Sequence, residues 1–73
     1  MTIDVHGLTI KELPKFLDDI MYKAVSTRIE EIEFITGLGP LQDAIMDMCV
    51  EVYKCGVRRK MDNKGILIVS FSL

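Results

Sequence analysis

The sequence predicts an α/β fold, a two-layer sandwich in which a four-stranded mixed sheet carries two helices on one face, in the order β-α-β-α-β-β. The length of 73 residues allows a single domain, residues 1–73, with a thin core. Short β-branched segments alternate polar and apolar residues, and the segments between them repeat apolar residues at helical spacing. Right-handed crossovers would place both helices on the same side of the sheet.

The first two elements are a strand and a helix. Residues 2–6 alternate polar and apolar side chains, so Asp4 and His6 share the face opposite the buried one. Thr9 and Glu12 have the spacing of a capping box, which predicts that a helix begins there. The apolar stripe of this helix is expected to contain Ile10, Leu13, Leu17, Ile20, Met21 and Ala24.

A second strand and helix follow. Acidic and apolar residues alternate over 28–35, which predicts a strand, and the glycine-rich loop 36–39 then brings Pro40 to the favoured first helical position. We expect the second helix to end near Gly56, with this glycine as a left-handed cap. Its predicted apolar stripe contains Leu41, Ala44, Ile45, Met48, Cys49 and Val52.

The last part of the chain predicts a hairpin. Residues 57–61 and 66–73 have strand character, and residues 62–65 between them are typical of a turn. The final segment begins as an almost continuous apolar run, which favours a position inside the sheet.

Composition excludes several classes of protein. Hydrophobic residues make up 49% of the chain and charged residues 27%, which favours a compact domain over a disordered segment. No apolar run approaches the roughly 18 to 20 residues of a membrane span, and the N-terminus lacks the features of a signal peptide. Cys49 and Cys55 are not spaced like metal ligands, and His6 is the single histidine. We therefore expect a cytoplasmic protein with reduced thiols, no structural metal site and no membrane partner.

Charge is distributed unevenly. Residues 1–53 contain four basic and ten acidic residues, whereas residues 54–73 contain five basic residues and one acidic residue. The basic residues Arg58, Arg59 and Lys60 predict either a patch that faces phosphates or an ordinary solvated hairpin face. No aromatic platform for stacking bases is apparent, so base specificity is not expected.

The candidate functional residues lie at one edge of the predicted sheet. The loops that follow the two parallel strands lie at the same edge as the N-termini of the following helices, where backbone N–H groups favour an anion such as phosphate. Asp4 and His6 are suited to act as an acid–base pair there, although a histidine at the end of a strand is also a common turn residue. The loop 36–39 lacks the further residues of a dinucleotide fingerprint or a P-loop.

Two segments resemble the signatures of the Smr (small MutS-related) family. Residues 3–7, Ile-Asp-Val-His-Gly, resemble its Leu-Asp-x-His-Gly motif, and residues 36–39, Thr-Gly-Leu-Gly, resemble its His-or-Thr-Gly-x-Gly motif. The order of elements agrees over nearly all of the chain. The resemblance implies a fold like that of the C-terminal domain of bacterial translation initiation factor three. It also implies a nucleic-acid role, which in some members is associated with DNA nicking or RNA cleavage.

Carried over by position, the resemblance implies that Asp4 and His6 are catalytic. The residues expected to contact nucleic acid, from the two loops and the hairpin, are Gly7, Thr36, Gly37, Leu38, Gly39, Arg58, Arg59 and Lys60. The family loop commonly runs Gly-Lys-Gly-x-Gly and is followed by Leu-Arg. Here Leu38 replaces the lysine, the third glycine is missing and Gln42 follows Leu41, so the loop is shorter and uncharged. Cleavage would then require a divalent ion such as Mg²⁺, or a partner, to supply positive charge.

The leading hypothesis is a small Smr-like nucleic-acid-binding protein that cuts RNA or DNA phosphodiesters as an endonuclease, with RNA slightly preferred. The alternative is a non-catalytic module that docks on nucleic acid or a ribosome-like target through the basic hairpin. A third hypothesis is a protein adaptor or homo-oligomer, motivated by Met21, Met46 and Met48, although methionines at helical spacing usually belong to the core. We expect a monomer.

Overall fold

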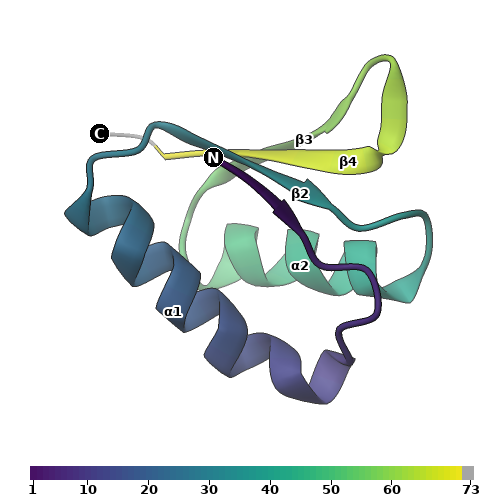
Figure 1. Cartoon of the computed structure of the whole chain (residues 1–73), viewed down its shortest axis with the longest axis horizontal. Helices are drawn as coiled ribbons and strands as arrows, with labels where there is room; N and C mark the ends of the chain where they lie inside the picture. The colour runs from purple at the N-terminus through teal and green to yellow at the C-terminus, as the bar shows by residue number, and fades with distance from the viewer. Residues whose placement is uncertain (72–73) are drawn as a thin grey trace.

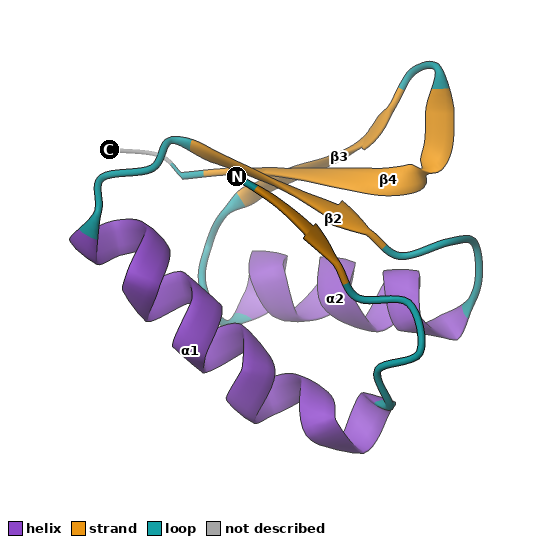
Figure 2. Ribbon diagram, viewed as in Figure 1, coloured by secondary structure: helices purple, strands orange, loops and turns teal. Residues whose placement is uncertain are grey.

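Two helices pack against one face of a four-stranded sheet (Figures 1 and 2), as predicted. The computed structural model describes residues 1–71. The elements are β1 (Thr2–Asp4), the 3-10 helix η1 (Ile10–Glu12), α1 (Leu13–Ser26), β2 (Glu31–Ile35), α2 (Pro40–Glu51), β3 (Gly56–Lys60) and β4 (Asn63–Ser70). None of the helices in this part of the chain has both the length and the apolar character required to cross a membrane.

The sheet has the strand order β1-β2-β4-β3. Strand β1 is parallel to β2, whereas β4 is antiparallel to both of its neighbours. The predicted position of the last strand inside the sheet is therefore confirmed. That strand begins at Asn63, three residues earlier than expected, and residues 72–73 of the prediction lie outside the described residues.

The capping box at the start of the first helix is confirmed, but it begins a 3-10 turn. The Glu12 carboxylate accepts a hydrogen bond from the Thr9 N–H at 3.0 Å, and the Glu12 N–H donates to the Thr9 hydroxyl at 3.3 Å. Helix α1 begins only at Leu13. The prediction that Ile10 belongs to the buried stripe is wrong, because Ile10 lies on the tighter turn and is exposed.

Both parallel strands are shorter than predicted. Strand β1 ends at Asp4 because the chain then turns, and the Leu8 N–H donates to the Val5 carbonyl at 3.0 Å. Strand β2 starts at Glu31 because Arg28 adopts a left-handed conformation, φ 58°, as the chain leaves α1.

The second helix ends earlier than predicted, at Glu51, and leaves Val52 exposed. The left-handed residue is Lys54, with φ 57°, and the expectation that Gly56 is the cap is wrong. The Cys55 N–H donates to the Cys49 carbonyl at 2.9 Å, six residues back along the chain, and this bond closes the end of the helix with Lys54 at the left-handed position. Gly56 is instead the first residue of β3.

The core lies between the helices and the inner face of the sheet. It includes side chains from both helices and from strands β2 and β4, which confirms most of the predicted stripes. The most deeply buried apolar residues are Leu13, Leu17, Ala24, Ile32, Phe34, Ile45, Cys49, Leu67 and Val69.

Candidate nucleic-acid interface

The ends of the two parallel strands form one edge of the molecule. Asp4 is paired in register with Ile35, so the segments 5–8 and 36–39 leave the sheet side by side (Figure 1). The β3–β4 hairpin reaches the same edge, because the N–H groups of Thr36 and Gly37 donate to the Gly65 carbonyl at 2.9 and 3.0 Å. We call the two segments 5–8 and 36–39 the loop edge, and the hairpin turn lies beside it.

Asp4 and His6 are in direct contact at the loop edge. One carboxylate oxygen, Oδ1 of Asp4, lies 2.5 Å from Nδ1 of His6 and also accepts from the His6 backbone N–H at 3.1 Å. These hydrogen bonds hold the pKa of the Asp4 carboxyl below its ordinary value of 3.8. A carboxylate at Nδ1 favours the tautomer whose proton is on that nitrogen, which leaves Nε2 as a proton acceptor.

The turn after β1 presents the imidazole to solvent. Gly7 has φ +90°, which a residue with a side chain rarely adopts, and this conformation lets the chain reverse directly after His6. The His6 side chain is 74% exposed, so a substrate can reach Nε2 without any rearrangement of the protein.

The glycine loop is built to expose backbone donors. Gly37 and Gly39 have φ values of +71° and +144°, and Gly39 precedes Pro40 at the start of α2. Among residues 1–71, the N–H groups of Leu38 and Gly39 have no hydrogen-bond partner. These donors at a helix N-terminus suit an anionic ligand.

Thr36 has an internal role in this arrangement. Its side chain is buried, and its hydroxyl lies 2.7 Å from the Gly37 carbonyl and 3.1 Å from the Gly65 carbonyl. The same hydroxyl accepts from Gln42 Nε2 at 3.2 Å. The threonine side chain therefore stabilises the glycine loop and is turned away from the surface, while Leu38 is exposed.

Gln42 is the residue that sequence reasoning missed. It is only 2% exposed, and its Nε2 donates to the Lys64 carbonyl at 2.7 Å. Its Oε1 accepts from Nε of Arg59 at 2.8 Å. The signal in the sequence is its spacing, three residues before Ile45 and seven before Cys49, which puts a polar side chain on the buried face of the helix.

The three basic residues of β3 do not form one patch. Strand alternation places Arg58 and Lys60 on the open face of the sheet and turns Arg59 toward α2. Each has an acidic neighbour: Arg58 with Glu31 and Lys60 with Glu33, both at 3.5 Å, and Arg59 with Asp43 at 3.6 Å. Such partly exposed ion pairs are worth about 0 to 1 kcal/mol, so a phosphate can replace the acidic partner at little cost.

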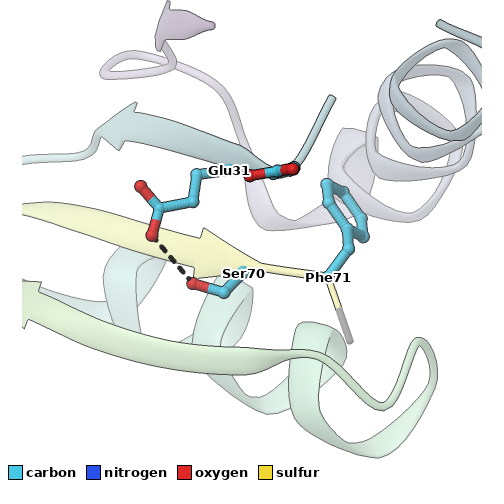
Figure 3. Close-up of a pocket in the computed structure, with 4 residues that line it drawn as sticks. Glu31, Ser70 and Phe71 are labelled. Atoms are coloured by element: carbon cyan, nitrogen blue, oxygen red, sulfur yellow. Dashed lines mark hydrogen bonds between the residues drawn. The ribbon is translucent and has the colours of Figure 1, made fainter. Parts of the chain in front are cut away.

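Two other features are relevant to the site. Among the described residues, no three His, Cys, Asp or Glu side chains are grouped so that they could hold a metal ion. A pocket lined by Glu30, Glu31, Ser70 and Phe71 lies where β2 begins, whereas the loop edge is where β2 ends (Figure 3). The Ser70 hydroxyl donates to Glu31 Oε2 at 3.2 Å there, and none of the predicted site residues lines this pocket.

Comparison with known proteins connects this architecture to a solved structure. No protein-family model matches the sequence, and no curated protein sequence matches it. The crystal structure of the Smr domain of Thermus thermophilus MutS2 is similar, with a TM-score of 0.86 and 18% sequence identity. The alignment covers 99% of this chain and 98% of that one. The chain therefore has the Smr-domain fold, as its two sequence signatures predict.

Proposed function

Because the chain has the Smr-domain fold, we propose that it binds nucleic acid at the loop edge and cleaves a phosphodiester there, as a small endonuclease acting on RNA or DNA. The observation that carries this proposal is the contact between Asp4 and His6 next to the glycine loop. An oriented imidazole beside unpaired backbone donors combines a proton acceptor with a phosphate site.

In this mechanism, His6 Nε2 removes the proton from the attacking hydroxyl, whose oxygen forms a new bond to phosphorus. The bond from phosphorus to the leaving oxygen breaks, that oxygen takes a proton from water, and the imidazolium returns its proton to solvent. Asp4 keeps the other ring nitrogen protonated and stabilises the imidazolium that forms. RNA carries its own nucleophile, the 2′-hydroxyl next to the scissile phosphate, which favours RNA over DNA as the substrate of a site with one general base. The backbone N–H groups of Leu38 and Gly39 bind the phosphate oxygens.

The surrounding charges hold the flanking phosphates. Arg58, Arg59 and Lys60 exchange their carboxylate neighbours for phosphate oxygens when nucleic acid binds. A divalent ion such as Mg²⁺ would add positive charge at the scissile phosphate. Its ligands would be the Asp4 carboxylate and the substrate, because Mg²⁺ is often bound by one carboxylate plus phosphate oxygens.

A cleavage assay on end-labelled structured RNA, with and without Mg²⁺, tests this proposal. We expect the wild type to cut and His6→Ala to lose about 100-fold or more in rate, as for the removal of a general base. The exposed position of His6 means that the variant should fold normally. Asp19→Asn, an exposed carboxylate on α1, serves as the control and should cut like the wild type. Cleavage by His6→Ala at the wild-type rate would contradict the proposal.

The second candidate is a non-catalytic nucleic-acid-binding module. It is favoured by the single histidine, the uncharged glycine loop and the lack of a three-ligand metal cluster within residues 1–71. In that case neither the wild type nor His6→Ala cuts the RNA, and both proteins bind it with an affinity that falls steeply as the salt concentration rises. Binding curves at two or more salt concentrations, measured on the same samples, distinguish the two candidates.

A further inference from the structure

The tip of the β3–β4 hairpin presents an apolar side chain to solvent. Met61 lies in the turn between the two strands and is 98% exposed. Turns of this kind usually carry Gly, Asn, Asp or Ser, whose backbone preferences or side-chain hydrogen bonds favour the turn. A fully exposed methionine makes no packing contribution to the fold, so its side chain is free to contact another molecule.

The hairpin is firmly attached to the loop edge. The Lys64 carbonyl accepts from Gln42 at 2.7 Å, and the Gly65 carbonyl accepts from both Thr36 and Gly37. The pairing of β3 and β4 shifts register between Arg59 and Lys60, and such irregularities bend a hairpin. In Figure 1 the tip bends away from the helices and projects from the sheet. Met61 is therefore held in a defined place relative to the proposed site.

The charges beside the tip identify its partner. Lys60 precedes Met61 and Lys64 follows it, and Asp62 is the one acidic residue among residues 54–71. A second copy of this chain would bring a tip with the same two lysines and one aspartate, which offers no opposite charge to pair with. Phosphates next to an apolar surface, as at an unstacked base step, complement both the lysines and the methionine.

We propose that the hairpin tip, residues 60–64, is a wedge that places Met61 against an exposed base step of structured RNA while Lys60 and Lys64 bind the flanking phosphates. Methionine is long, flexible and polarizable, and inserted apolar side chains of this kind unstack a base step in other complexes. This inference rests on the proposed function and names its substrate class. Duplex RNA with a bulge should bind better than the same duplex without one, because part of the unstacking is already done.

The test compares two RNA duplexes of the same sequence, one with a single-nucleotide bulge and one continuous, in buffer without Mg²⁺. We expect the full-length wild type to bind the bulged RNA about tenfold more tightly, and a 2-aminopurine next to the bulge to brighten as it unstacks. Met61→Ser should abolish the preference and the brightening, and Met61→Leu should keep both. Val25→Ser, which replaces an exposed apolar residue at the end of α1, should also keep both.

Each other result has a defined meaning. If Met61→Ser keeps the wild-type preference, the wedge is wrong while the proposed function remains intact. If the wild type binds neither RNA, the proposed function and the wedge both fail. If the wild type sediments as a dimer and Met61→Ser as a monomer, the tip is a self-association surface and the wedge is overturned.

Discussion

Gln42 is a neutral amide buried at the point where α2, β3 and β4 meet. Its three side-chain hydrogen bonds reach Thr36, Lys64 and Arg59, so it ties the glycine loop to the hairpin. Gln42→Leu has nearly the same shape but leaves these groups without partners, which costs about 1 to 3 kcal/mol for a buried polar group. We expect a loss of free energy of unfolding in that range, measured by urea denaturation followed by circular dichroism.

The control for this substitution lies on the same helix. Asp47 is exposed, and Asp47→Ala should change the free energy of unfolding by less than about 0.5 kcal/mol. Equal stability of Gln42→Leu and the wild type would mean that water or neighbouring groups satisfy these partners equally well, and that the loop and the hairpin are not coupled through this residue.

The residues of the candidate site differ in how far the sequence could predict them. Alternation along the first strand predicted that Asp4 and His6 share one face, but the strand ends at Asp4. The two side chains meet because the chain turns there, with the His6 N–H donating to Asp4 Oδ1. The hydrogen bonds of Gln42 depend on residues 6, 17 and 22 positions away in the chain, which no local pattern encodes. The helical spacing could have predicted that Gln42 is buried, but it could not have predicted its hydrogen-bond partners.

At the scale of elements, β4 approaches the glycine loop very closely. A Cβ atom on Gly65 would lie 3.3 Å from the Cα of Gly37 and 3.3 Å from Oδ1 of Asn63. Gly65→Ala should therefore push the loop away and destabilise the protein by about 1 to 3 kcal/mol, as overpacking does. Hydrogen exchange should become faster at the N–H groups of Thr36 and Gly37, because both donate to the Gly65 carbonyl.

Gly56→Ala is the matched control for this substitution. Gly56 also lies in a strand, but a Cβ there would come no closer than 3.9 Å to a neighbouring atom, and its φ is not in the left-handed region. Alanine at this position should be neutral or slightly stabilising, because it reduces the freedom of the unfolded chain. If Gly65→Ala and Gly56→Ala change the free energy of unfolding equally, the close approach of Gly65 to the glycine loop is not what makes alanine unfavourable at position 65.

The ends of the elements were harder to predict than the elements themselves. The capping box was predicted because its two residues, Thr9 and Glu12, are only three positions apart in the sequence. The end of α2 was not, because glycine is the usual left-handed residue and here Lys54 takes that conformation. Likewise, the run Arg58-Arg59-Lys60 suggested one basic patch, whereas its ion-pair partners come from β2 and α2.

At the scale of the whole molecule, the helices cover one face of the sheet and charged side chains cross the other. Because β4 lies between β3 and β2, the pairs Arg58–Glu31 and Lys60–Glu33 extend over it. These pairs offset the positive charge of the hairpin in the unbound protein. They do not involve Met61 and Lys64 at the hairpin tip or the backbone donors of the glycine loop, which stay available to a partner.

The single core also sets how the protein responds to alkali. Burial raises the pKa of the Cys49 thiol to about 12, and burial raises the pKa of Cys55 and of Tyr53, whose hydroxyl is also bonded to Asp18. A thiol whose pKa is higher in the folded state stabilises the fold fully below its ordinary value of 9.0, and this contribution is lost as the pH rises toward 12. The free energy of unfolding should therefore fall above pH 9, by up to about 1.4 kcal/mol per pH unit for each group.

Cys49→Ala separates the thiol from the other groups that titrate in alkali. The variant should be less stable than the wild type at pH 7, because it leaves a small cavity among fully buried side chains. Above pH 9 its stability should decline less steeply, because one of the titrating groups is gone. Urea denaturation of both proteins at pH 7, 9 and 10.5 measures the two slopes. Parallel slopes would show that this thiol ionises equally readily in the folded and unfolded chains, and this result would contradict the prediction.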